Sequence, residues 1–119
     1  MQDKDKFHKR DGSLQTELET ALAVIGGKWK SIILDQLTEG EKRFNELNKC
    51  IPEITKRSLT LSLRELEEDG MVRRTVTADG PRKVEYALTD IGNSVGELID
   101  AFRNWGKNYQ TTFLGDIDK

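Results

Sequence analysis

The chain has 119 residues and a formal net charge of -2, and about a third of its residues are charged, which indicates one soluble domain with a dense charged surface. A single cysteine and a single histidine exclude an internal disulfide and argue against a zinc site or histidine catalysis, so we expect no metal, no cofactor and no enzyme activity. No apolar run is long enough to cross a membrane, and the polar N-terminus lacks a signal-peptide core, so we expect a cytoplasmic protein without a membrane partner.

The N-terminal part of the chain divides into a tail and a first helix. Residues 1–13 are charged and aperiodic, which predicts a flexible polar tail before a single domain over residues 14–115. The first helix should begin after Thr16, which can form a capping box with Glu19, and should end at Gly26.

Two more helices are expected before the middle of the chain. The second should run from near Lys28 to Gly40, and the short third helix should follow Arg43 and stop before Pro52. The buried stripe of the second helix is predicted to be Trp29, Ile32, Ile33 and Leu37. The third helix is predicted to bury Phe44, Leu47 and Ile51.

A fourth helix and a hairpin follow. The helix should begin after the N-cap Thr55 and end before Gly70. Its inner stripe is predicted to be Leu59, Leu63 and Leu66. Residues 71–77 and 83–88 alternate as two strands around a turn at residues 78–81, which predicts an antiparallel hairpin.

A long last helix is expected to start after Thr89. Its apolar residues recur at three- and four-residue steps: Ile91, Val95, Leu98, Ile99, Phe102, Trp105 and Tyr109. This stripe is longer than the small core could cover, so we expect it to pack on a partner subunit. The predicted fold class is mainly α with a small antiparallel β-hairpin, which is the layout of a winged helix-turn-helix DNA-binding domain.

Charge is unevenly distributed along the fourth helix. With the leucine stripe turned inward, the outer face is basic and free of acids for two turns, and four acids follow near the C-terminal end. Because the N-terminal part of a recognition helix enters the major groove, this polarity favours DNA binding. The predicted DNA contacts on this helix are Thr55, Lys56, Arg57, Thr60, Leu61 and Arg64.

The chemistry of these side chains suggests their roles. Arg57 and Arg64 suit guanine edges or phosphates, and Leu61 suits a thymine methyl group. The alternative is a solvated helix face on which Leu61 is covered by a neighbouring loop.

The hairpin adds a second basic cluster. Arg82 and Lys83 adjoin the turn, where they could reach flanking phosphates or a minor groove. The alternative is a hairpin kept soluble by its charge, in which Arg73 or Arg74 pairs with a helix acid such as Glu67.

Several motifs in order resemble one known family. They are IGGKWKSIIL at residues 25–34, RFNEL at 43–47, IPEIT at 51–55, LRELEEDGMV at 63–72, VEYALTDIG at 84–92 and the final Trp105-Gly106. Over residues 16–106 the chain resembles the HxlR-type winged helix regulators, which are relatives of the MarR-type regulators.

This resemblance implies a homodimer built from the first and last helices, a two-fold symmetric operator, and repression as the commoner outcome. The dimer contacts that it implies are Leu18, Leu22, Leu98, Phe102, Trp105 and Tyr109. Members of the family that sense oxidants or electrophiles resemble one another in a cysteine at the start of the first helix. Thr16 stands there in this chain, so the conventional thiol sensor is missing.

Cys50 is the only thiol left to consider. Beside Lys49 it could be a reactive thiolate that senses oxidants or electrophiles. The interpretation that we favour is a small, half-buried core cysteine.

We therefore expect a regulator that binds double-stranded DNA at a palindromic operator as a homodimer, with an effector that the sequence does not identify. The alternative is a winged-helix protein interaction module, whose protein partner would cover the face that carries Arg57 and Arg64.

Overall fold

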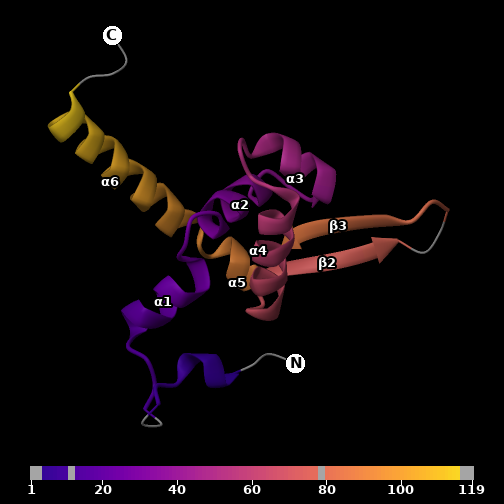
Figure 1. The fold of residues 1–119 in the computed structure, drawn as a ribbon, viewed down its shortest axis with the longest axis horizontal. Helices are drawn as coiled ribbons and strands as arrows, with labels where there is room; N and C mark the ends of the chain where they lie inside the picture. The colour runs from indigo at the N-terminus through magenta and orange to yellow at the C-terminus, as the bar shows by residue number, and fades with distance from the viewer. Residues whose placement is uncertain (1–3, 11–12, 78–79, 116–119) are drawn as a thin grey trace.

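The structure, a computed structural model, describes residues 4–10, 13–77 and 80–115 (Figure 1). Its elements in chain order are the 3-10 helix η1 (Lys4–Phe7), α1 (Glu17–Ile25), α2 (Lys30–Leu37), β1 (Lys42–Arg43), α3 (Phe44–Cys50), α4 (Lys56–Glu68), β2 (Val72–Thr77), β3 (Lys83–Leu88), α5 (Asp90–Asn93) and α6 (Gly96–Leu114). Positions 78 and 79 of the predicted hairpin turn lie outside the described residues. Within the described chain, no helix has the length and apolar composition needed to cross a bilayer.

Helices α3 and α4 form a helix-turn-helix, and local hydrogen bonds fix both ends of α4. The Thr55 hydroxyl accepts from the Ser58 N–H at 3.0 Å, which confirms the predicted N-cap. At the other end Gly70 has a φ of +76°, and the Met71 N–H donates to the Leu66 carbonyl at 2.9 Å, so the helix closes where the glycine predicts. In the turn, Glu53 adopts a left-handed conformation with a φ of 69°.

One hydrophobic core lies beneath α4, and the predicted inward face of that helix is confirmed. The largest fully buried side chains are Ile33, Leu34, Leu47, Ile51, Leu59, Leu63 and Leu66. The predicted stripe of α2 is partly wrong, because Ile32 is 40% exposed and Leu34 is buried in its place. The helix is also shorter than expected, beginning at Lys30 and ending at Leu37.

The sheet has one strand more than the predicted hairpin. Its order is β1-β3-β2, and β2 pairs with β3 from Val72 opposite Leu88 to Thr77 opposite Lys83. The two-residue strand β1 adds to the other edge of β3, with Lys42 opposite Tyr86. A strand this short carries no periodic signal in the sequence. The helix-turn-helix followed by this sheet confirms the predicted winged helix-turn-helix fold.

The predicted long last helix is divided in two. Thr89 caps the short α5, accepting from the Gly92 N–H at 3.1 Å and donating to the Gly70 carbonyl at 2.5 Å. The chain then turns at residues 94 and 95 into α6, which extends away from the body of the domain (Figure 1). The break follows Gly92, Asn93 and Ser94, which are weak helix formers.

The N-terminal segment has more structure than the sequence predicts. The capping box of α1 is confirmed, with Thr16 and Glu19 exchanging hydrogen bonds of 3.0 and 3.2 Å. Before it, η1 lies against the end of α4, where Lys6 binds Asp69 at 2.8 Å. Residues 4–10 thus make contacts with the domain that the sequence does not predict. This contact joins residues 63 positions apart, which a local pattern does not reveal.

Gly92 provides a test of how α5 packs. A Cβ atom at this buried position would lie 2.1 Å from the Met71 carbonyl oxygen, so either the backbone or α5 would have to move. We expect Gly92→Ala to lower the free energy of unfolding by about 1–3 kcal/mol, as overpacking does. Gly96→Ala is the control, because a Cβ atom there meets nothing within 4 Å. Urea denaturation of both variants measures the difference, and equal stabilities would contradict this packing.

Candidate nucleic-acid interface

The outer face of α4 is exposed as the sequence predicts. Its exposed residues include all six predicted contacts: Thr55, Lys56, Arg57, Thr60, Leu61 and Arg64. Leu61 is 44% exposed, so a covering loop is not part of the structure. The Thr60 hydroxyl donates to the Lys56 carbonyl at 2.8 Å, which leaves its oxygen free to accept a hydrogen bond.

The cations of this face form no ion pair with any acid that the structure describes. The ion pairs of the described residues involve other cations: Lys6, Lys9, Lys30, Lys42 and Arg103. Within the same part of the chain, Lys56, Arg57 and Arg64 have no carboxylate partner. An anionic ligand could therefore bind them without first breaking an internal ion pair.

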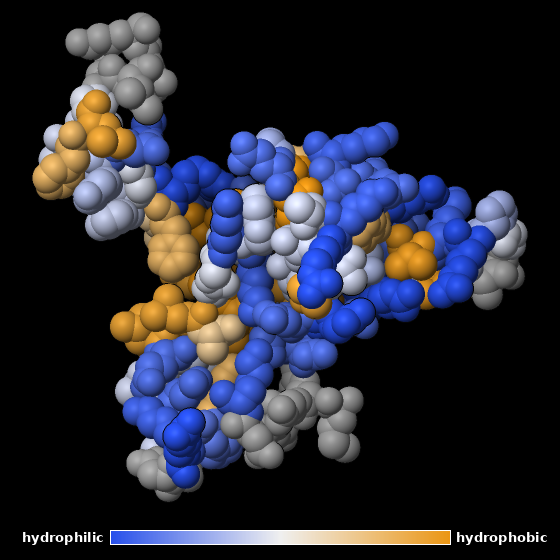
Figure 2. Space-filling model, in the orientation of Figure 1, coloured by the Kyte–Doolittle hydropathy of each residue, from blue (hydrophilic) through white to orange (hydrophobic). Residues whose placement is uncertain are grey.

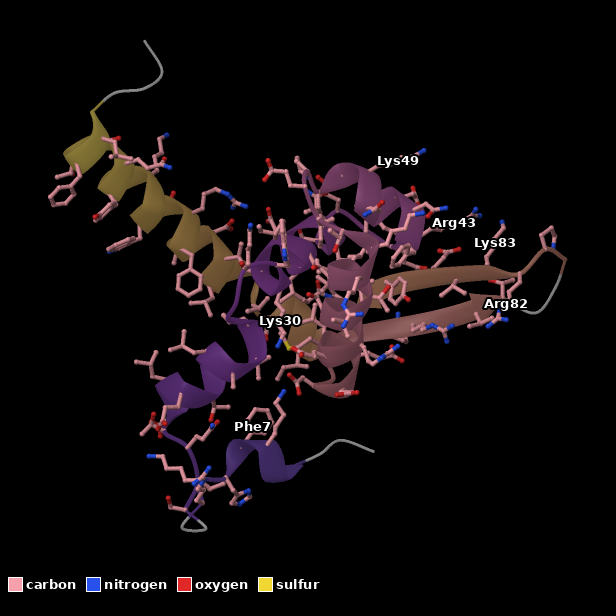
Figure 3. All side chains as sticks on the ribbon, viewed as in Figure 1. Phe7, Lys30, Arg43, Lys49, Arg82 and Lys83 are labelled. Atoms are coloured by element: carbon pink, nitrogen blue, oxygen red, sulfur yellow. The ribbon has the colours of Figure 1, made fainter. Side chains whose placement is uncertain are left out.

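The sheet extends the basic surface beyond α4. Arg82 and Lys83 are exposed at the distal end of the hairpin, where Figure 3 shows them on the side away from α1 and α6. Arg73 and Arg74 are also exposed, and neither pairs with Glu67 or any other acid in the described chain. The alternative in which these arginines are neutralised by helix acids is therefore wrong.

A groove of about 630 Å³ lies between the outer side of α4 and the strands β2 and β3, which form the wing of the fold. Arg64 and the acids Glu67 and Glu68 of α4 line it, together with Arg74 of β2 and Tyr86 of β3. Arg74 and Tyr86 are not predicted from the sequence as part of the site, because their place beside Arg64 depends on how the sheet packs on the helix. Because residues of α4, β2 and β3 line the same groove, the outer face of α4 and the wing adjoin each other.

Two further basic residues flank this surface. Arg43 and Lys49 are exposed at the two ends of α3, and Figure 3 shows both on the side of the molecule that carries the wing. In a helix-turn-helix, the helix before the recognition helix crosses the DNA backbone, where such cations bind phosphate. A signal for them was present in the sequence, since both residues border the predicted third helix.

Cys50 is exposed as the last residue of α3, so the interpretation as a half-buried core cysteine is wrong. The pKa of the Lys42 ammonium is raised, first by a hydrogen bond to the Glu39 carboxylate and to a lesser degree by the charge of a thiolate at Cys50. The thiol thus lies beside a lysine that is already paired with an acid.

A second exposed surface, apolar rather than basic, lies on α1 and α6. Figure 2 shows hydrophobic residues gathered along this side of the molecule, away from the wing. All six side chains that the family resemblance implies for a dimer are exposed: Leu18, Leu22, Leu98, Phe102, Trp105 and Tyr109. Trp105 stacks on Tyr109 with ring centroids 5.3 Å apart, and Phe113 continues the row at 4.8 Å. Phe113 is not among the residues that the sequence predicts for this surface.

Comparison with known proteins agrees with this geometry. The profile described as HxlR-like helix-turn-helix matches residues 24–113. The chain is 50% identical over 93 residues to the HTH-type transcriptional regulator YdeP of Bacillus subtilis (strain 168), covering 78% of this chain and 73% of that protein.

Solved structures give the same result. The crystal structure of the HTH-type transcriptional regulator ytcD is similar with a TM-score of 0.73 and 46% identity, over 80% of this chain and 97% of that one. The redox regulator HypR in its reduced form is similar with a TM-score of 0.78 and 42% identity, over 85% of this chain and 100% of that one. The chain therefore belongs to the HxlR-like helix-turn-helix family, whose members are transcriptional regulators and not enzymes.

Proposed function

We propose that this transcriptional regulator binds a specific DNA operator as a homodimer, with α4 of each protomer in a major groove and the wing on flanking phosphate. The observation that carries the proposal is the group of unpaired cations on the outer face of α4, in a protein whose net charge is only -2. A patch of this kind attracts DNA by its local field even when the whole molecule is nearly neutral.

The distribution of acids supports one direction of docking. From Lys56 to Arg64, α4 carries cations at Lys56, Arg57 and Arg64 and no acid, while acids begin at Glu65. Entry by the N-terminal half brings cations to the phosphates and keeps the carboxylates at the rim of the groove. Of the acids near the rim, Glu65 and Asp69 are neutralised by lysines of the same protein.

The apolar surface on α1 and α6 supports the homodimer. Exposed aromatic and leucine side chains in one contiguous area are typical of a surface that a partner covers. A two-fold dimer would present two α4 helices to half-sites about one duplex turn apart, so the operator would be palindromic. A dimer bound across promoter DNA would act as a repressor.

Arg57 and Arg64 test direct reading of the bases. We expect Arg57→Ala and Arg64→Ala each to weaken operator binding by about 1–3 kcal/mol, with a smaller loss on random DNA, since a guanine contact exists only at the cognate site. Fluorescence anisotropy on both duplexes measures the two losses. Lys107→Ala on α6 is the matched control, because it removes an exposed cation far from the wing. Equal losses on both DNAs would mean that these arginines bind only phosphate.

The wing is tested by the salt dependence of binding. Replacing Arg82 and Lys83 together by alanine should reduce affinity to a similar extent on cognate and random DNA, because phosphate contacts carry little sequence information. The slope of log affinity against log salt should become shallower by about 0.9 for each lost phosphate contact. An unchanged slope would remove the wing from the interface. If the affinity of the wild-type protein for DNA does not depend on salt, phosphate contacts do not hold the DNA. That result would favour the alternative, in which a protein partner covers this face.

The homodimer is tested by placing charges on the apolar surface. Phe102→Glu with Trp105→Glu should produce monomers in sedimentation velocity, since buried unpaired carboxylates oppose association. Leu61→Glu is the control, because Leu61 is exposed to nearly the same extent as Phe102, 44% against 49%, but lies on α4. It should leave the dimer intact and reduce DNA binding. A dimer that survives the α6 changes would refute this interface.

A further inference from the structure

Two acids on α4 bind lysines that come from outside the helix-turn-helix. Glu65 and Asp69 lie one helical turn apart and therefore on the same side of the helix. Lys30 Nζ lies 2.6 Å from Glu65 Oε2, and Lys6 Nζ lies 2.8 and 2.9 Å from the two oxygens of Asp69. The C-terminal half of α4 is thus fastened at two consecutive turns.

Each of these pairs joins an enclosed side chain to a more exposed one. The Asp69 side chain is 3% exposed and its partner Lys6 is 33% exposed, and the Lys30 side chain is 12% exposed and its partner Glu65 is 53% exposed. The pKa of Glu65 is lowered, first by the hydrogen bond from Lys30 and also by the charges of Lys30 and Lys6. For the enclosed carboxylate of Asp69 and the enclosed ammonium of Lys30, a lost partner costs more than it would on an open surface.

The neighbouring acids of α4 show that the pairing is specific to position. Glu67 and Glu68 are exposed, and neither binds a cation among the described residues. Among the described residues, ion pairs therefore hold this helix only through Glu65 and Asp69.

Both lysines are connected to α1. The Lys30 ammonium also donates to the Ala23 carbonyl of α1 at 3.4 Å. Lys6 belongs to the segment that leads into α1, and the carbonyl of its neighbour Phe7 accepts from the Gln15 N–H at 3.0 Å. These contacts therefore connect α1, which carries part of the apolar surface, to the C-terminal half of α4, whose outer face is basic.

We propose that Lys6 and Lys30 are positioning residues, which hold α4 at a fixed tilt relative to α1 through Asp69 and Glu65. In a dimer joined through α1 and α6, this tilt sets the separation of the two α4 helices and so the fit to both half-sites. The proposal rests on the proposed function. None of the four side chains needs to touch DNA.

The direction in which the affinity for the operator changes distinguishes a positioning role from a simple electrostatic effect. Neutralising an acid near DNA removes repulsion, so Glu65→Gln and Asp69→Asn should bind any DNA more tightly if charge alone matters. If the acids position α4, the same changes should weaken binding to the operator. The lysine variants Lys6→Gln and Lys30→Gln change the net charge the opposite way, yet the positioning role predicts the same loss.

The experiment measures the affinity of the full-length protein for an operator selected from random DNA and for a scrambled duplex. We expect each of the four variants to lose about five-fold or more in preference for the operator, which corresponds to roughly 1 kcal/mol. Glu67→Gln is the matched control, which should bind both DNAs as tightly as the wild type or slightly more tightly. Circular dichroism confirms that each variant is folded at the assay temperature.

A charge-exchange variant distinguishes a loss of operator preference caused by the broken ion pair from a loss caused by misfolding. Lys6→Gln with Asp69→Asn should lose no more preference than either change alone, and Lys6→Asp with Asp69→Lys should recover part of it. Tighter operator binding by Asp69→Asn and Glu65→Gln, matching Glu67→Gln, would overturn the inference. The inference would also be overturned if the losses of operator preference from Lys6→Gln and Asp69→Asn added up in the double variant. A wild type with no preference for any DNA would overturn the proposed function itself, and with it this inference.

Discussion

The burial of three leucines on one side of α4 is the constraint on which the rest of the surface depends. Leu59, Leu63 and Leu66 are at most 2% exposed and lie at the centre of the core. Loss of one such side chain costs about 2–5 kcal/mol, so the helix cannot rotate to present another face. Because side chains advance about 100° per residue, fixing this stripe inward fixes Arg57, Leu61 and Arg64 outward.

The protein separates two populations of positive charge. One population stabilises the fold, as in the pairs from Lys6 to Asp69 and from Lys30 to Glu65. The other lies on the outer face of α4 and on the wing without carboxylate partners in the described chain. A nearly neutral net charge is therefore compatible with a strongly basic local surface, which explains why whole-chain composition is uninformative about DNA binding here.

The sequence predicts the fold and the candidate site where local rules apply. The caps at Thr16 and Thr55, the glycine stop at Gly70 and the leucine period of α4 are each encoded within a few residues. These signals are sufficient to place every predicted contact of α4 on the exposed face. They are sufficient because one strongly amphipathic helix carries most of the site.

The errors occur where distant contacts decide the structure. The pairing of β1 with β3 and the docking of η1 on Asp69 join segments far apart in the chain. The close approach of Gly92 to the Met71 carbonyl likewise joins α5 to a residue distant in the sequence. Cys50 was misplaced because the third helix ends there, and its last residue turns outward. Neither helical period nor propensity carries this information.

Selection of bound sequences from a random DNA library tests the central claim most directly. If the outer face of α4 reads the major groove from a two-fold dimer, the selected sequences should converge on a palindrome whose half-sites lie about one duplex turn apart. Recovery of sequences without any consensus, at an affinity equal to that for the starting library, would contradict the claim.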